Sequence, residues 1–286
     1  MRYAKNFKDY ELIDATDGER LERWGNIILI RPDPQVIWSL PRKNPLWNNA
    51  HAIYHRSNKG GGYWEQLKKV PDCWDISYGE LKFNLKPMGF KHTGLFPEQA
   101  VNWDMMANMI KEAKRPISVL NLFAYTGGAT LACLEAGAAV THVDASKGMV
   151  AWAKENARVS GLADRSVRWL VDDCMKFVQR EIRRGNKYDA VVLDPPSYGR
   201  GPDGEVWKLE DQLGDMLGCI KQILSDEPLF VLLNSYTGGI SPTITGFMME
   251  NYIGEGKGKI ETGEIGLYIT DRKTVLPAGN STIWMP

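Results

Sequence analysis

The stretch Val119-Leu-Asn-Leu-Phe-Ala-Tyr-Thr-Gly-Gly128 decides the fold class. It begins as a short apolar strand and ends in a glycine turn that leads into a helix. A glycine turn lets the backbone approach a ligand closely, and the helix behind it directs free N–H groups toward that ligand. The stretch therefore predicts a strand, turn and helix with a ligand at the turn.

Predicted strands and helices alternate from residue 117 onward. The strands are 117–122, 140–143, 167–170 and 190–193, and the helices between them are 128–136, 148–159 and 173–184. Such alternation is typical of a parallel sheet with helices on both faces. A helix at 209–224, a strand at 229–234 and two antiparallel strands at 259–270 and 274–284 complete the prediction. The fold class is α/β, a Rossmann-like doubly wound and mostly parallel sheet with an antiparallel C-terminal strand.

The first 90 residues have another character, rich in Trp, Pro and Gly, with short β-like runs at 24–31, 36–40 and 81–85. We expect a small β-rich domain over residues 1–92, followed by a helix at 97–114. Residues 93–286 then form the domain with the parallel sheet.

Composition excludes several classes of protein. The 286 residues are 43% hydrophobic and 24% charged with a formal net charge of zero, so global charge does not indicate a nucleic-acid or membrane partner. No signal peptide and no membrane span are expected. Four scattered cysteines without a Cys-x-x-Cys pair indicate free thiols in the cytoplasm.

Acidic residues follow the second and third strands of the predicted sheet. Asp144 stands where a nucleotide ribose would lie, and the alternative is a solvated acid at a strand end. Ser146 either contacts the same ligand or caps the next helix. Asp173 can accept from an adenine amino group, although either Asp172 or Asp173 is expected to cap a helix.

The spacing of the glycines indicates which nucleotide is bound. The turn lacks the third glycine of Gly-x-Gly-x-x-Gly, which packs helix against strand in dinucleotide-binding folds. S-adenosylmethionine has no pyrophosphate, so a shorter loop can hold it, and we predict this cofactor. The turn residues expected to contact it are Phe123, Ala124, Tyr125, Thr126, Gly127 and Gly128.

The segment Asp194-Pro-Pro-Ser-Tyr198 follows the fourth strand and predicts the reaction centre. Pro195 and Pro196 stiffen the backbone and remove two donors, which leaves an acceptor-rich corner suited to a target amine. Asp194 can hold or orient that amine, and Tyr198 can stack on a flat base. The alternative is a rigid turn at the end of a core strand.

Basic and aromatic residues are interleaved between residues 41 and 69. Cations that meet phosphates, mixed with rings that stack on bases, suit single-stranded RNA. The alternative is a solvated basic loop above a small core. No pair among His51, His55 and Cys73 has zinc-like spacing, so no metal is expected. The residues predicted to bind substrate are Arg42, Lys43, Arg56, Lys59, Tyr63 and Trp64.

The chain resembles class I S-adenosylmethionine-dependent methyltransferases, and more narrowly the bacterial large-subunit rRNA methyltransferases, which include cytosine-C5 and guanine-N7 enzymes. The resemblance covers residues 90–286 well and 10–90 loosely, and its motifs are specific for methyl transfer but poorly specific for substrate. It implies that the turn residues surround the methionine end, that Asp144 and Asp173 bind ribose and adenine, and that Asp194 faces both methionine amine and substrate. The matching segments are Asn121–Gly128, Val143-Asp-Ala-Ser-Lys147, Asn156, Asp173, Asp194-Pro-Pro196, Leu276-Pro-Ala and Lys91–Gln99.

The chain also departs from that family. Its cytosine-C5 members use a cysteine after the fifth strand, where residues 232–238 contain none, and Cys73 is the alternative thiol. Tyr198 lies one position later than the aromatic residue of amino-group methyltransferases. We therefore predict methylation of RNA at a nitrogen.

Other functions stay open at this stage. The same enzyme class acting on a small molecule or a protein is the first alternative, since the net charge is zero. An NAD(P)-linked oxidoreductase and a non-catalytic nucleotide-binding protein are the others. The sequence does not determine the oligomeric state, and a dimer is compatible with it.

Overall fold

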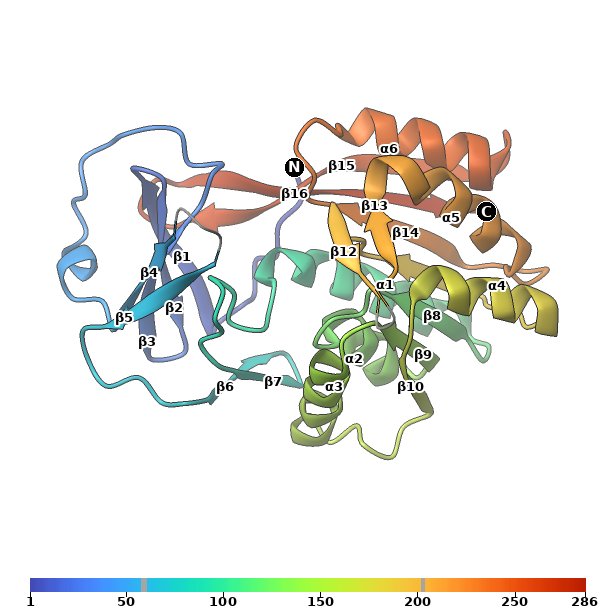
Figure 1. Cartoon of the computed structure of the whole chain (residues 1–286), viewed down its shortest axis with the longest axis horizontal. Coiled ribbons are helices and arrows are strands. Elements are labelled where there is room, and N and C mark those ends of the chain that lie inside the picture. The colour runs from blue at the N-terminus through green and yellow to red at the C-terminus, as the bar shows by residue number, and fades with distance from the viewer. Residues whose placement is uncertain (58–60, 202–203) are drawn as a thin grey trace. The chain divides into compact units, whose positions relative to one another are not determined.

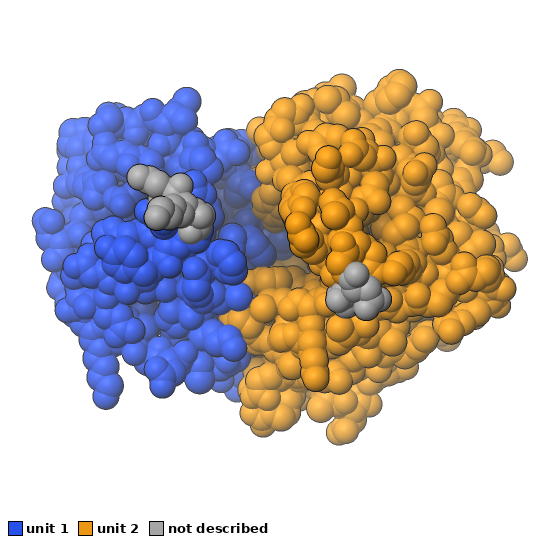
Figure 2. Space-filling view, viewed as in Figure 1, with its two compact units in different colours: residues 1, 3–100, 266–278 blue, residues 2, 101–265, 279–286 orange. Residues whose placement is uncertain are grey.

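The computed structural model describes residues 1–57, 61–201 and 204–286. The chain forms two compact units, coloured separately in Figure 2. Unit 1 comprises residues 1, 3–100 and 266–278, and unit 2 comprises residues 2, 101–265 and 279–286. The prediction divides the chain at residue 92, whereas unit 1 extends to residue 100 and regains residues 266–278. The reason is that Ile269 pairs with Leu12, which joins a C-terminal strand to the N-terminal sheet.

The sheet of unit 2 has the predicted parallel core. Its order is β10 (Val167–Val171), β9 (Ala139–Asp144), β8 (Ser118–Leu122), β11 (Ala190–Leu193), β14 (Phe230–Ser235) and β16 (Thr274–Met285). The first five strands are parallel, and β16 runs antiparallel to β14. The Rossmann-like fold class with an antiparallel C-terminal strand is therefore confirmed.

Helices cover both faces of this sheet, as Figure 1 shows. In β11, Val191 and Leu193 belong to the apolar core beneath two helices, while Val192 is buried on the opposite face. The helices on the face of Val191 and Leu193 include α4 and α5, which pack side by side. The helices α2 and α3 form a separate packed pair. The helices are α1 (Ala100–Ala113), α2 (Gly128–Glu135), α3 (Lys147–Val159), α4 (Cys174–Arg184), α5 (Leu209–Gln222) and α6 (Pro242–Met249), which continues into a π-helical turn, η3 (Glu250–Gly254).

Unit 1 is β-rich, as predicted, and the predicted run 81–85 is a strand with those bounds, but the other two predicted runs differ from the structure. The run 24–31 is divided, because Gly25 turns at φ 62° between β2 (Glu19–Trp24) and β3 (Ile27–Pro32). The run 36–40 contains no strand. The other strands are β1 (Tyr10–Thr16), β4 (Ala52–Arg56), β5 (Gly62–Gln66), the hairpin β6 (Trp74–Tyr78) and β7 (Leu81–Leu85), and the end of β15 (Lys259–Ile269); short 3₁₀ turns are η1 (Pro45–Asn48) and η2 (Pro97–Gln99).

Charged side chains lie inside unit 1. The carboxylate of Glu22 is fully buried and accepts hydrogen bonds from the Tyr10 hydroxyl at 2.8 Å and from the Arg31 guanidinium at 2.6 and 2.8 Å. Arg20 forms an ion pair with Asp33 at 3.1 Å. Burial opposes ionisation of Glu22, but Arg31 and Arg20 overcome it and lower its pKa to about 2. This network takes the place of part of an apolar core.

Among the helices in the described ranges, none is both long and apolar enough to span a bilayer.

Candidate active site

The predicted site residues of unit 2 gather at the carboxyl edge of the parallel sheet. The glycine turn follows β8, Asp144 ends β9, and Asp173 and Asp194 follow β10 and β11. These four strands are parallel and in register, so their carboxyl ends share one edge. Ligands of such sheets bind at this edge.

The turn after β8 has an unusual backbone. Phe123 and Tyr125 have φ of 55° and 49°, in the left-handed region that non-glycine residues rarely adopt. Hydrogen bonds hold this shape: the Ala124 N–H donates to Val143 O at 3.1 Å, and the Asn156 side chain donates to Thr126 O at 2.8 Å. Strain of this kind persists only where surrounding contacts enforce it, and it concentrates at ligand sites.

The two glycines of the turn are required by packing. Gly127 has φ of 89°, and a Cβ on it would lie 3.0 Å from the Ala153 methyl group. A Cβ on Gly128 would lie 2.6 Å from the ring of Trp103, a buried residue of α1. No side chain caps α2 at Gly127, so the turn offers backbone donors. Sequence analysis did not identify Trp103, because its position in α1 gave no sign that it packs against the turn.

Asp144 is fixed by backbone donors. Its Oδ2 accepts from the Tyr125 N–H and its Oδ1 from the Ser146 N–H, both at 2.8 Å. Burial raises the pKa of this carboxyl group, while the two N–H donors act in the opposite direction. Each carboxylate oxygen keeps a further lone pair, so the group is suited to accept from ligand hydroxyls.

Two other predicted contacts serve as helix caps. The Ser146 hydroxyl accepts from Met149 N–H at 3.4 Å at the start of α3. Asp173 Oδ1 accepts from Lys176 N–H at 2.8 Å at the start of α4. Asp172 instead forms an ion pair with Arg180. The structure thus resolves which of the two acids caps the helix.

The Asp194-Pro-Pro corner lies next to the glycine turn. Pro195 is buried and Pro196 is exposed. The carbonyl of Pro196 accepts from Trp207 Nε1 at 2.8 Å, and the Trp207 ring lies 4.9 Å from the ring of Phe123. One tryptophan therefore links the predicted reaction centre to the predicted cofactor turn.

Trp207 belongs to a hairpin in a segment for which no strand was predicted. Its strands are β12 (Tyr198–Arg200) and β13 (Val206–Lys208), in antiparallel register. Tyr198 opens the hairpin with 52% of its surface exposed, so its ring is accessible for stacking. The hairpin is also joined to α4, because Glu205 forms an ion pair with Lys176.

The predicted substrate residues lie in unit 1 and differ in accessibility. Arg42 is paired with Asp17 and Glu19 and lies 4.1 Å above the Trp47 ring, so acids already neutralise it. Trp64 is half-buried and donates to Met88 O at 2.9 Å. Lys59 lies outside the described residues. Lys43, Arg56 and Tyr63 are exposed.

Comparison with known proteins identifies the family. Residues 48–212 match the family model of S-adenosylmethionine-dependent methyltransferases. The chain belongs to this family. The crystal structure of the SAM-dependent methyltransferase from Agrobacterium tumefaciens is similar, with a TM-score of 0.95 and 38% identity over 99% of this chain and 92% of that chain.

Curated relatives match a shorter part of the chain. A ribosomal RNA large subunit methyltransferase K/L from Shewanella frigidimarina is 31% identical over 62% of this chain and 24% of its own length. A protein of the same name from Cellvibrio japonicus is 28% identical over 65% of this chain and 25% of its own length. The chain therefore spans about a quarter of these relatives.

The chemistry of the sheet edge fits the cofactor of this methyltransferase family. S-adenosylmethionine presents ribose hydroxyls, an adenine amino group and a methionine ammonium and carboxylate. The edge supplies carboxylates to accept from the first three and an uncapped helix start for the last.

One buried polar residue at the same sheet edge was not among the predicted site residues. Leu233 of β14 pairs with Leu193, so Asn234 lies beside Asp194 in the register. Asn234 is buried and its Oδ1 accepts from Asn102 of α1 at 3.1 Å, while Asn102 accepts from Arg2 at 3.1 Å. Its position in the segment 232–238 was the available signal.

The thiols of unit 2 are poor nucleophiles. Burial raises the pKa of Cys133 to about 12 and that of Cys174 well above its ordinary value. Burial also raises the pKa of Cys219, which lies in α5. Within the ranges that the structure covers, no group of three metal-binding side chains is found.

Proposed function

We propose that this methyltransferase transfers the methyl group of S-adenosylmethionine to a nitrogen of RNA, within the enzyme class EC 2.1.1. The observation that carries the proposal is the contact from Pro196 through Trp207 to Phe123, which couples the Asp-Pro-Pro corner to the strained cofactor turn. The absence of cysteine from residues 232–238 favours nitrogen over cytosine C5.

The proposed cofactor contacts come from three strand ends. Asp144 accepts from the ribose hydroxyls, and Asp173 accepts from the adenine amino group with the oxygen that does not cap α4. Ser146 adds a contact beside the ribose. The turn residues Phe123–Gly128 surround the methionine end. When bound, the cofactor supplies an activated methyl group.

The proposed reaction centre aligns a nitrogen nucleophile. Asp194 accepts an N–H of the target amine and orients its lone pair, while Pro195 and Pro196 keep the corner rigid. Tyr198 stacks on the target base. Methyl transfer from a sulfonium needs alignment and exclusion of water more than acid–base catalysis, which suits a site without a catalytic triad.

The proposed RNA contacts are Arg56, Lys43 and Tyr63 of unit 1, with Arg42, Lys59 and Trp64 as further candidates. Arg56 lies near other cations, because burial, followed by the charges of Arg31, Lys91, Arg20 and Arg56, lowers the pKa of His92 to about 3. The relatives' names add support, since both are ribosomal RNA methyltransferases. In this proposal residues 93–286 carry methyl transfer, residues 1–92 contact substrate, and the enzyme acts in the cytoplasm.

The experiment has two stages. Calorimetry with S-adenosylhomocysteine, compared with NADH, is expected to show micromolar binding of the first alone. Transfer of a labelled methyl group to deproteinised rRNA is then expected for wild type and to be abolished in Asp194→Ala with the fold retained. Full activity of Asp194→Ala contradicts the reaction centre, and label on protein or small molecules but not on RNA contradicts the substrate.

Filter binding of rRNA fragments at several salt concentrations tests the role of unit 1. Removing one cation that neutralises a phosphate lowers the slope of log affinity against log salt by about 0.7–0.9. We expect Arg56→Gln to reduce the slope by about that amount. Arg158→Gln is the matched control, because Arg158 lies in unit 2 and Glu155 already neutralises it. Equal slopes in wild type and Arg56→Gln contradict the proposed role of Arg56.

A further inference from the structure

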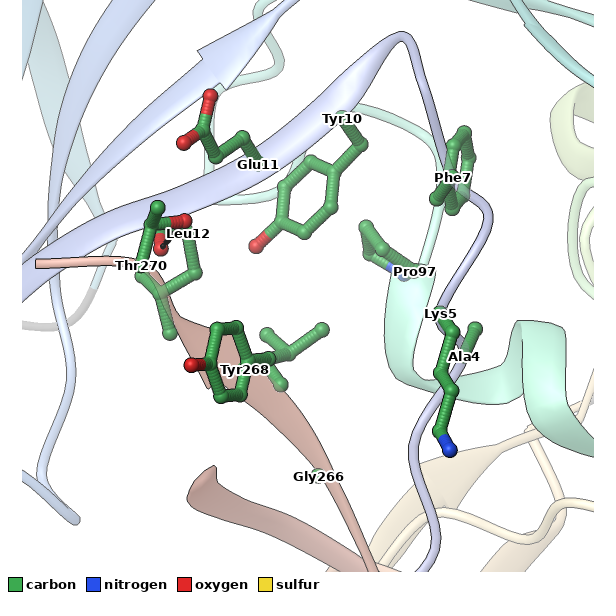
Figure 3. A pocket seen from close by; sticks show the side chains of 11 residues that line it. Ala4, Lys5, Phe7, Tyr10, Glu11, Leu12, Pro97, Gly266, Tyr268 and Thr270 are labelled. Carbon is green, nitrogen blue, oxygen red and sulfur yellow. Dashed lines mark hydrogen bonds between the residues drawn. The ribbon is translucent and has the colours of Figure 1, made fainter. Parts of the chain in front are cut away.

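A cavity of about 140 Å³ opens in unit 1 between β1, β15 and the first residues of the chain. The cavity lies where β1 and β15 separate, on the N-terminal side of their paired residues. Leu12 and Ile269 are paired, and Thr270 N–H donates to Leu12 O at 3.0 Å, but the residues before them on each strand line the cavity instead. Figure 3 shows the side chains around the hollow that results.

One wall of the cavity is a fixed aromatic ring. Tyr10 is 6% exposed, packs edge-on against Trp24 at 4.6 Å between ring centroids, and donates its hydroxyl to Glu22 at 2.8 Å. Burial, followed by the charge of Glu22, raises its pKa well above the ordinary value, so the phenol stays neutral. Phe7 lies 5.7 Å from Tyr10 and extends this wall.

A second ring is accessible to solvent. Tyr268 lines the cavity from β15, and 39% of its surface is exposed. It stacks on Tyr3 with 5.6 Å between centroids and 17° between planes. Stacking holds the ring in place, so it can receive a flat ligand without losing much conformational freedom.

Two charged residues, Lys5 and Glu11, also line the cavity. The Lys5 ammonium lies 6.0 Å from the Tyr3 ring, where it can meet an anion. The Glu11 carboxylate is directed away from the hollow in Figure 3 and is paired with Arg23 at 3.2 Å. The volume is close to the roughly 150 Å³ that holds one benzene ring in a protein interior.

We propose that this cavity is a subsite for one pyrimidine base of an RNA strand, with the base against Tyr10 and Tyr268 and a neighbouring phosphate at Lys5. The volume is close to that of a site for one six-membered ring, which favours a pyrimidine over the larger purine. The inference rests on the proposed RNA substrate and adds a preference that the reaction centre does not supply.

The test measures binding of fluorescein-labelled hexauridylate and hexaadenylate to the full chain by anisotropy. Base stacking on one aromatic ring corresponds to roughly 5- to 150-fold in affinity. We expect Tyr268→Ala to weaken hexauridylate binding at least fivefold while hexaadenylate binding changes less than twofold. Tyr268→Phe keeps the ring and is expected to match wild type, and Lys5→Gln is expected to reduce the salt dependence.

Two results would overturn the subsite. One is equal hexauridylate affinity in wild type and Tyr268→Ala, and the other is no hexauridylate binding by wild type. Neither depends on methyl transfer, which the rRNA assay measures separately. If wild type methylates rRNA but Tyr268→Ala binds hexauridylate as tightly as wild type, only the subsite is contradicted. If hexauridylate binding depends on Tyr268 but rRNA is not methylated, only the proposed function is contradicted.

Discussion

The two units place their charged side chains differently. In the part of unit 2 that the structure describes, the buried strand residues include no carboxylate, ammonium or guanidinium group, as in Ala190–Leu193, and acids such as Asp144 and Asp194 collect where strands end. In unit 1, charged residues such as Glu22, Arg31 and Arg20 lie within strands and point into the interior. The first arrangement leaves strand ends available for ligands. The second makes the fold of the smaller unit depend on complete pairing of buried charges.

The largest expected effect breaks the buried network of unit 1. Glu22→Ala leaves Arg31 and Arg20 without their shared carboxylate, and we expect a loss of about 3–5 kcal/mol in the free energy of unfolding. Glu11→Ala is the matched control, because the Glu11–Arg23 pair is about a third exposed and its loss should cost less than about 1 kcal/mol. Urea denaturation of both variants measures the difference, and equal losses would contradict the comparison.

The next effect concerns a strand end in unit 2. Asp144→Ala removes an acceptor for ligand hydroxyls, and we expect affinity for S-adenosylhomocysteine to fall by about 2 kcal/mol, roughly 30-fold. The substitution also leaves the Tyr125 and Ser146 N–H groups without their acceptor, and each lost hydrogen bond should cost about 1 kcal/mol of stability. Asp172→Ala, in the adjacent strand end and paired with Arg180, is the control and should bind normally. Calorimetry decides, and unchanged affinity in Asp144→Ala places the ribose elsewhere.

Acid should destabilise unit 2 through its buried imidazole. Burial lowers the pKa of His142 to about 3, while the unfolded chain takes up a proton near pH 6.5. Stability from this residue is therefore complete above pH 6.5 and is lost as the pH falls toward 3, by at most about 1.4 kcal/mol per pH unit. Denaturation at pH 7.5, 6 and 5 should show a flatter profile for His142→Gln. An unchanged profile would show that other groups cause the acid sensitivity.

The smallest effect compares strain at the site with strain elsewhere. Tyr125 and Lys114 both have positive φ, of 49° and 52°, and glycine at either position should raise stability by about 0.5–1 kcal/mol. Tyr125→Gly should also weaken S-adenosylhomocysteine binding several-fold, since the turn loses its fixed shape. Lys114→Gly, just after α1, should leave binding unchanged. If Lys114→Gly weakened binding as much as Tyr125→Gly, the effect could not be assigned to the shape of the cofactor turn, and the comparison would fail.

Particular elements show why prediction succeeded for some strands and not for others. Strand 190–193 is apolar throughout and was located to the residue. Strand β2, Glu-Arg-Leu-Glu-Arg-Trp, was not predicted, because its buried positions include Arg20 and Glu22 and hydrophobic periodicity gives no signal there. The turn Asp17-Gly18, with φ of 53° and 76°, is a strong hairpin signal that was available in the sequence. The hairpin of β12 and β13 was not predicted, because glycines interrupt the alternation of apolar and polar residues that indicates a strand.

The sequence by itself determined the parallel sheet, the order of its elements and the acids that follow its strands, since these depend on local hydrophobic patterns and turn residues. Tertiary structure alone decided which groups meet. Trp207 reaches both Pro196 and Phe123, Trp103 packs on Gly128, and Asn234 lies beside Asp194. Such contacts join residues far apart in the chain, and packing of the whole unit selects them. The pairing of Glu22 with Arg31 has the same origin, because the charges are favourable inside unit 1 only when folding brings them together.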